Sequence, residues 1–433
     1  MTSLLPSGQE GSHAMAWTKV LAGLVGMLVL CGSFCAAQPV SFTCIDHPEV
    51  SLPAFGRCPV CGIDLLPAGK AGTAPAVGEK FRVPDGTAVV REVDITRVVA
   101  NDYSRRFRFD SCDNPKLKRL REQEKLDEAV AGGADEFDRQ VRLLDWVYRR
   151  VKKFGTPTAN PRGALEIFKA VDEGHTFFCA HYASALVSCA ASLGWIARPL
   201  GLRIGVRQHG TGAEEHSAVE MWSNQFDKWV FFDPTYASYV EKNGVPLSAW
   251  EVRQEWFYGD PEKLAFVIGK ERKKYRLADM PIFRATHAGF GDLALGPRTI
   301  DKLAFIMFIP NTDLMDSPPD YEKAFIVKDD TLCEGIRWHR RDNPKDPATE
   351  PYFPLNQADM TVVFWQGDEV KVWLRTNTPN FKTFRLRIDG KKWADCGRAF
   401  SWNLHKGVNT CETVSVNAFG VEGHPSKVII EVR

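Results

Sequence analysis

Neither sign of charge predominates in this sequence, and its apolar run near the N-terminus is short for a membrane-spanning helix. The 433 residues carry 55 Lys and Arg against 54 Asp and Glu, a net charge of +1 at pH 7. This balance gives no argument for nucleic acid or for an acidic substrate as a partner. The run Val20 to Leu30 falls short of the roughly 20 apolar residues that a span requires.

Cysteine is too sparse for a disulfide scaffold, and no internal repeat is evident. Eleven cysteines are spread over the whole chain, whereas disulfide-dense domains are short and Cys-rich. The apolar content of 44% is ordinary for a globular protein. The length therefore predicts two or three domains, each with its own core.

Residues 1–37 predict a secretory signal peptide rather than a folded segment. Lys19 precedes the apolar run, small residues follow it, and translation from Met15 would give the signal normal proportions. We expect cleavage after Ala37 and a periplasmic or extracellular protein. Lipidation at Cys31, or retention of the run as an uncleaved anchor, is the alternative and the only membrane association that we expect.

Four metal-ligand residues follow directly, in the segment 41–68. Cys44 and His47 form a C-x₂-H pair, and ten residues later Cys58 and Cys61 form a C-x₂-C pair. Three thiolates and one imidazole suit a tetrahedral site for Zn²⁺, or for the soft ion Cu⁺. A segment this small buries little surface, so a metal would have to hold it together. Disulfide pairing in an oxidising compartment or a fortuitous cluster is the alternative.

Composition and periodicity divide the rest of the chain into three parts. Residues 69–80 are rich in Gly, Ala and Pro and predict a flexible linker. Helical spacing starts the catalytic domain, 81–280, and short strands with turn signals between them fill 300–433. The strands expected there are Leu303 to Ile309, Thr361 to Trp365, Glu369 to Arg375, Phe381 to Ile388, Thr410 to Asn417 and Val428 to Val432.

Cys179 stands at the start of a predicted helix. Apolar residues recur at helical spacing after it, and Gly194 ends the pattern. The free N–H groups and the dipole of a helix N-terminus favour an anion, and can lower a thiol pKa from about 8.5 to roughly 3.5–7.5. The same N–H groups could bind an oxyanion. The alternative is a small core residue, which describes Cys189 on the same helix better.

Two predicted strands place His216 and Asp233 together. Residues 215–222 and 228–235 alternate in polarity on either side of a turn. If Trp222 pairs with Trp229, Asp233 lies on the same face as His216 and diagonal to it. An Asp beside a His fixes its tautomer and stabilises the imidazolium, leaving the other ring nitrogen for a thiol.

The stretch from about Asn160 to Trp250 resembles the transglutaminase-like superfamily, thiol enzymes with a papain-like Cys-His-Asp arrangement. The resemblance implies a helix packed against an antiparallel sheet. It also implies Cys179 as nucleophile, His216 as general base and acid, and Asp233 as the orienting residue, with no cofactor required for catalysis. Many members carry Gly two residues before the Cys, where this chain has Phe177.

The two flanking regions resemble other families. The segment 41–68 is similar to the heavy-metal-binding domain of copper-efflux components and metal-transporting ATPases, but Ile45-Asp46 and Ile63 stand where those relatives carry Met. This departure favours structural or zinc-like binding. The C-terminal hairpin resembles fibronectin type III and Ig-like domains, which suggests placement or partner binding. Cys396 and Cys411 either pair or are two core cysteines.

Together these features predict an α+β protein with a papain-like transglutaminase core, a small N-terminal metal-binding module and a C-terminal β-sandwich-like domain. The functional hypothesis is a secreted thiol enzyme that transfers or hydrolyses acyl groups of a protein or peptide substrate through a Cys thioester. The alternative is a non-enzymatic metal-binding or adhesive protein with a relic transglutaminase-like domain.

Overall fold

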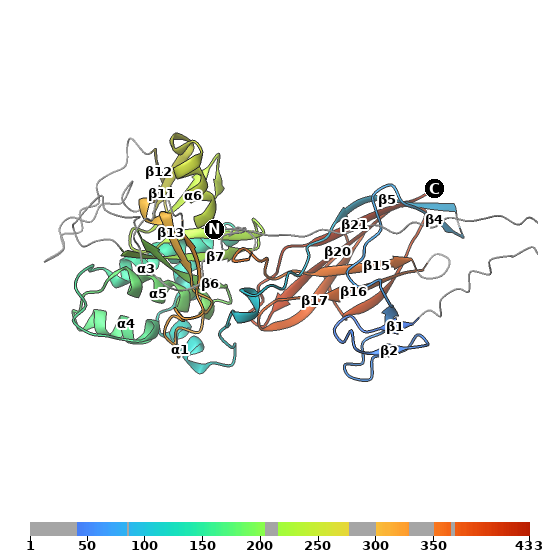
Figure 1. The fold of residues 1–433 in the computed structure, drawn as a ribbon, viewed down its shortest axis with the longest axis horizontal. Helices are drawn as coiled ribbons and strands as arrows, with labels where there is room; N and C mark the ends of the chain where they lie inside the picture. The colour runs from blue at the N-terminus through green and yellow to red at the C-terminus, as the bar shows by residue number, and fades with distance from the viewer. Residues whose placement is uncertain (1–40, 85, 204–214, 277–299, 329–349, 365–368) are drawn as a thin grey trace, which may run out of the picture. The chain divides into compact units, whose positions relative to one another are not determined.

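The structure is a computed structural model that describes residues 41–84, 86–203, 215–276, 300–328, 350–364 and 369–433 (Figure 1). The predicted signal peptide lies outside the described residues. Among the residues that are described, no helix combines the length and the apolarity needed to cross a membrane.

The transglutaminase-like part is built on an antiparallel sheet with the strand order β12-β11-β9-β8-β7-β6-β13-β14, and β10 pairs with β9. Its central hairpin pairs Trp222 with Trp229, so the predicted register is confirmed. The strands are β6 (Ala197–Arg203), β7 (Glu215–Ser223), β8 (Lys228–Asp233), β9 (Ser238–Lys242), β10 (Val245–Pro246), β11 (Leu264–Ile268), β12 (Lys273–Arg276), β13 (Phe305–Phe308) and β14 (Phe325–Lys328).

Helices cover both faces of this sheet. On one face α5 packs against Val219 and Met221, and α1, α3 and α4 enclose it, so that most of its side chains from Tyr182 onward are buried. On the other face Trp222 and Trp229 pack with Val252 of α6. The helices are α1 (Pro115–Gln123), α2 (Leu126–Val130), α3 (Glu136–Val151), α4 (Gly163–Asp172), α5 (Cys179–Ser192) and α6 (Ala249–Tyr258).

A fully buried ion pair joins β6 to β7. The Nη2 atom of Arg198 donates to Glu220 Oε2 at 2.6 Å, and neither side chain is exposed. The other oxygen of Glu220 accepts from Ala249 N at the start of α6 and from the Tyr352 hydroxyl, each at 2.8 Å. The Arg198 guanidinium carbon lies 4.0 Å from the centroid of a Trp229 ring. Because the charges are paired and hydrogen-bonded, the sheet tolerates them in its core.

Two β-sheets pack into the C-terminal sandwich, with the orders β15-β16-β19 and β18-β17-β20-β21-β5-β4. The strands are β4 (Lys80–Val83), β5 (Gly86–Asp94), β15 (Asp359–Phe364), β16 (Glu369–Arg375), β17 (Phe381–Ile388), β18 (Ala394–Cys396), β19 (Ala399–Asn403), β20 (Gly407–Asn417) and β21 (Ser426–Val432). Cys396 and Cys411 are free thiols, and β17 lies between their strands.

The chain crosses the predicted domain limits twice. Residues 81–94, expected in the catalytic domain, lie in β4 and β5 of the sandwich, where β5 pairs with β21 (Figure 1). Residues 305–328, expected in the sandwich domain, supply β13 and β14 to the catalytic sheet, where β13 pairs with β6. Residues 303–309 were predicted as a strand, but alternating polarity does not identify the partner of a strand, so this segment was assigned to the wrong sheet. Residues 81–94 were not predicted as strands.

The predicted linker is not a free tether. Gly72 N donates to Thr361 Oγ1 at 2.9 Å, and Val362 N donates to Thr73 O at 3.1 Å, so this segment runs against β15. The interpretation of residues 69–80 as flexible is therefore wrong. The module before it consists of the short strands β1 (Phe42–Thr43), β2 (Ser51–Leu52) and β3 (Leu66–Pro67) in one sheet.

Removing Arg198 should destabilise the fold strongly, because Glu220 would be left buried and uncompensated. We expect Arg198→Met to lower the free energy of unfolding in urea by about 3–5 kcal/mol. As a control, Arg385→Met breaks the partly exposed ion pair with Glu422. This variant should change the free energy of unfolding by at most about 1 kcal/mol. Equal small losses in the two variants would contradict a central role for the buried pair.

Candidate active site and metal-binding cluster

His216 and Asp233 lie side by side at adjacent strand ends. His216 is the second residue of β7 and Asp233 the last of β8, and the distance from His216 Nε2 to Asp233 Oδ2 is 2.8 Å. The second oxygen of Asp233 accepts from Thr235 N at 3.0 Å, which fixes the carboxylate. The two side chains are 7% and 1% exposed. Since Nε2 faces the carboxylate, Nδ1 is the ring nitrogen left for a further partner.

That partner is Cys179. It is the first residue of α5, a partly exposed position, and its thiol lies close enough to the His216 ring and to the backbone of Ser217 for both to lower its pKa. Phe178, at the N-cap, supplies no side-chain acceptor to the helix, and the Cys179 N–H has no acceptor within the helix. The structure thus brings together the three residues that the sequence singled out.

The charges of the trio reinforce one another. Burial raises the pKa of the Cys179 thiol, but the charge and hydrogen bond of His216 outweigh it and hold that pKa below its ordinary value. Burial likewise lowers the pKa of His216, but Asp233 and Cys179 raise it to about 9. Both shifts favour the thiolate–imidazolium pair over the neutral thiol and imidazole.

Phe177, the departure from the family pattern, has a defined structural place. Its side chain is fully buried, its N–H donates to Lys153 O at 3.2 Å, and its carbonyl accepts from Gly155 N at 3.0 Å. These bonds pair the segment before Cys179 with the segment that follows α3. Backbone hydrogen bonds at Phe177 therefore fix the chain segment that leads into Cys179.

Two residues near the thiol were missed by the sequence analysis. Lys302 is 6% exposed, its Nζ donates to Glu215 O at 3.4 Å, and its charge helps to lower the pKa of Cys179. Burial, Cys179 and Glu215 raise the pKa of Tyr321. Both residues come from the 300–328 segment that was placed in the wrong domain. Tyr236, closer in sequence, covers His216 with its ring centroid 6.1 Å away.

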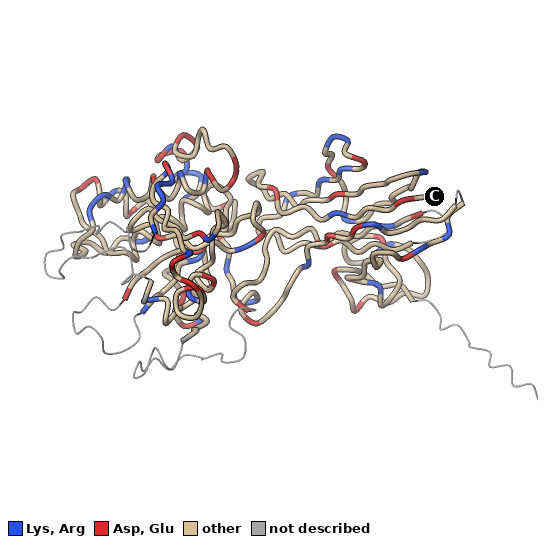
Figure 2. The backbone as a smooth tube through the Cα atoms, turned by 90° about the horizontal axis from the view of Figure 1, so that it is seen from above, with Lys and Arg blue, Asp and Glu red and all other residues tan. Residues whose placement is uncertain are grey.

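Figure 2 shows acidic and basic residues interspersed along the described backbone. This agrees with the balanced composition of the chain. The positive charge near the thiol is therefore a local feature of Lys302 and His216.

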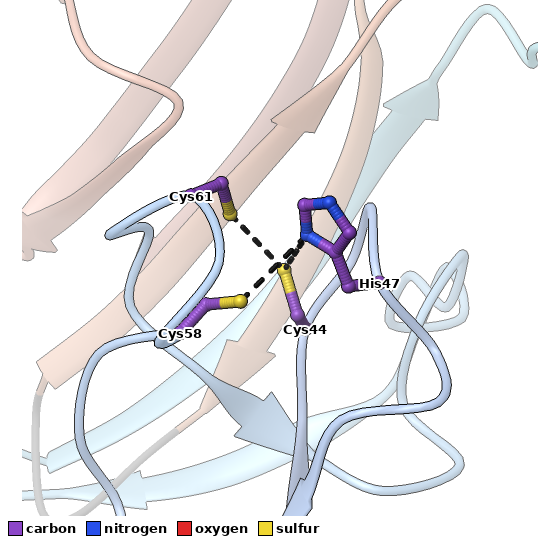
Figure 3. A group of neighbouring side chains, drawn as sticks. All are labelled: Cys44, His47, Cys58 and Cys61. Carbon is purple, nitrogen blue, oxygen red and sulfur yellow. Dashed lines mark hydrogen bonds between the residues drawn. The ribbon is translucent and has the colours of Figure 1, made fainter.

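The four predicted metal ligands form one cluster (Figure 3). Cys44 Sγ lies 3.5 Å from Cys61 Sγ and 3.6 Å from His47 Nδ1, and Cys58 Sγ lies 3.7 Å from the same nitrogen. A tetrahedral zinc ion, with Zn–S of about 2.3 Å and Zn–N of about 2.0 Å, sets its ligand atoms roughly 3.5–3.8 Å apart. All four ligand atoms lie within 4.8 Å of one another, so the cluster could hold a metal ion.

The fold and the trio define an α+β domain with a papain-like Cys-His-Asp arrangement. Residues 124–234, which include all three side chains, match the transglutaminase-like superfamily, so the chain carries a transglutaminase-like domain. No curated protein matches the chain.

Two solved structures are similar to parts of the chain. One is a protein from Cytophaga hutchinsonii assigned as a cysteine protease, with 14% identity, a TM-score of 0.23 and coverage of 34% of this chain and 48% of its own. The other is red sea bream transglutaminase, with 10% identity, a TM-score of 0.24 and coverage of 67% and 56%. The match thus spans about half the length of each structure.

Cys179 should react far faster than Cys189 with iodoacetamide at pH 6, by at least about tenfold. Cys189 is fully buried, and burial raises its pKa well above the ordinary value. Labelling is followed by mass spectrometry of the two peptides. His216→Ala should shift the Cys179 labelling profile to higher pH, since the charge that stabilises the thiolate is lost. Slow and equal labelling of both cysteines would exclude an activated thiol.

Lys302→Met should also move the Cys179 labelling profile to higher pH, because it removes a buried positive charge near the thiol. Lys302→Arg keeps the charge and should restore the profile. Lys323→Met is the control, since Lys323 is half-exposed and pairs with Asp320. The measurement is the labelling rate against pH. An unchanged midpoint in Lys302→Met would contradict a role for its charge in lowering the pKa of the thiol.

Proposed function

We propose that the transglutaminase-like domain is a thiol enzyme that acts on the acyl group of a peptide or carboxamide. The observation that carries this proposal is the position of His216 between two partners, with Nε2 at 2.8 Å from Asp233 and the ring close enough to Cys179 for each group to shift the pKa of the other. A structural histidine needs one such partner, whereas nucleophilic catalysis needs both.

The geometry supports a two-step reaction. The Cys179 thiolate attacks the carbonyl carbon, and the Cys179 N–H at the helix N-terminus stabilises the oxyanion that forms. His216 then gives its Nδ1 proton to the leaving nitrogen, the C–N bond breaks, and a thioester remains. In the second step His216 removes a proton from water or from an amine, which displaces the thiolate. Asp233 holds the imidazole in the required orientation throughout.

Water as the acceptor makes the enzyme a protease or amidase, and an amine makes it a transglutaminase. We favour hydrolysis, on the resemblance to bacterial-type secreted members. With the signal-like first 37 residues, this proposal places the protein in the periplasm or outside the cell. The non-enzymatic alternative requires a relic site. The three side chains, the paired charges and the fixed carboxylate favour an active one.

For the N-terminal cluster we propose Zn²⁺ as the ligand, with Cu⁺ as the second candidate. Three sulfur atoms and one imidazole nitrogen suit zinc, and three of the six ligand-atom separations, at 3.5–3.7 Å, match those of a closed tetrahedron. Cys44 and Cys58 are 1% and 2% exposed, and Cys61 is exposed. Zinc there would serve structure, because the nucleophile and its base both lie in the other domain.

Incubation of the pure protein with a casein-like substrate, with and without a labelled primary amine, tests the proposed enzyme. Hydrolysis should give peptide fragments or a new carboxylate and attach no label, whereas transamidation should attach the labelled amine. Cys179→Ala is the control and should abolish either product. If the wild type and this variant give the same traces on a range of proteins, the non-enzymatic alternative holds.

The pH dependence of kcat/KM gives a second test. Activity should rise as Cys179 ionises and fall as the pH passes about 9, since the proton of His216 is then lost and the leaving nitrogen cannot be protonated. Because the pKa of His216 is raised above its ordinary 6.5, its contribution to stability is full below about pH 6.5 and is lost through about pH 9. A plateau in activity beyond pH 10 would contradict the acid role of His216.

A further inference from the structure

The metal-binding module, residues 41–68, covers one face of the sheet β15-β16-β19. On β16, Val370, Val372 and Leu374 point into the sandwich core, whereas Trp373 points to the opposite face and packs with Ile45 and Leu66 of the module. Trp373 is only 1% exposed. Without the module, a large apolar side chain would lie on the surface of the sandwich.

Polar contacts fix the same interface. The indole Nε1 of Trp373 donates to Asp64 O at 2.8 Å, and Arg398 next to β19 pairs with Asp46. The ammonium group of Lys371 lies 4.3 Å from the centroid of the Phe55 ring. Apolar burial, a hydrogen bond and charge pairing therefore all act between the module and one sheet.

The docking residues alternate with the metal ligands along the chain. Ile45 and Asp46 stand between Cys44 and His47, and Ile63 and Asp64 follow closely after Cys61. Four of the docking residues, Ile45, Asp46, Ile63 and Asp64, thus lie within three positions of a ligand, and Leu66 follows in β3. A metal that fixes the loops also fixes the surface that meets Trp373.

The module has little else to hold these loops. Its own core consists of Cys44, Cys58 and Leu65, with Phe42 and Val50 packed against it. Its three strands have two residues each. So small a core does not hold a defined conformation without a cross-link, and two of its three members are ligands.

We propose that metal occupancy controls docking of the module on the sandwich. With zinc bound, the two loops cover Trp373. When zinc is lost, they loosen and the Trp373 face of the sheet becomes exposed. The inference rests on the zinc site proposed above, and adds to it a metal-dependent switch that acts on the C-terminal domain.

Linkage makes this proposal reciprocal. If zinc favours the docked module, then docking must strengthen zinc binding by the same factor. Substitution of Trp373 or Arg398, neither of which is a metal ligand, should therefore change the zinc affinity. A module that binds zinc independently of the sheet would show no such effect.

The first experiment measures Zn²⁺ affinity of the full chain by competition with a chelating indicator. Trp373→Ala and Arg398→Ala should each weaken binding by about tenfold, which corresponds to a coupling of about 1.4 kcal/mol. Trp393→Ala and Arg387→Ala are matched controls, since these two side chains stack on each other in the six-stranded part of the sandwich. They should leave the affinity unchanged.

The second experiment follows Trp373 directly, in protein labelled with 5-fluorotryptophan. The ¹⁹F signal that disappears in Trp373→Phe should move toward a solvent-exposed position when a chelator removes zinc, and return when zinc is added. Cys58→Ser should give the exposed signal even with zinc present. The proposal is overturned if the signal ignores zinc, or if the interface variants bind zinc as the wild type does. Absence of zinc uptake by the wild type would overturn the metal site as well.

Discussion

The buried Arg198–Glu220 pair is the constraint on which the catalytic sheet depends. It spans β6 and β7 at the register pair Arg198 and Glu220, and Glu220 also receives the first N–H of α6. A slip of one residue would turn Glu220 to the opposite face and leave both charges buried without a partner. The pair therefore fixes the register of β7 four residues from His216. The ion pair matters less for the net stability of the fold than for the register between β6 and β7. A triad that needs a 2.8 Å contact between neighbouring strands benefits from that registration directly.

The sequence predicted the trio because its geometry is local. One helix start and one tight hairpin place Cys179, His216 and Asp233, and the Trp222–Trp229 pair sets the hairpin register. Lys302 was not predictable in this way, because it approaches the thiol only after β13 has joined the sheet beside β6. Strand periodicity shows that a segment is half-buried and leaves its partner open. The residues of β4 and β5 were not predicted as strands at all, and were assigned to the catalytic domain by position in the chain.

The N-terminal module shows what composition leaves out. Gly, Ala and Pro predicted a loose tether, but the segment's backbone groups find partners on β15. Ile45 and Ile63, where heavy-metal modules of similar ligand spacing carry Met, both belong to the apolar cluster around Trp373. Their apolar character therefore has a structural reason in this chain. The spacing of the ligands identified the cluster. The spacing could not identify the sheet on which the neighbouring residues pack, because that sheet is distant in sequence: Asp64 and Trp373, which share a hydrogen bond, are 309 residues apart.

The pairing of β5 with β21 has a consequence for synthesis of the chain. Arg91 and Glu431, joined across these strands, are separated by 340 residues. A ribosome therefore releases β5 long before its neighbour exists, and the whole catalytic sheet emerges in the interval. Until the last strand is made, β5 presents an unpaired edge that invites association with other chains. A premature stop near the end of the message would thus remove β21 and leave β5 without its partner. Quality control would then meet an open sandwich in a chain whose transglutaminase-like domain is already complete.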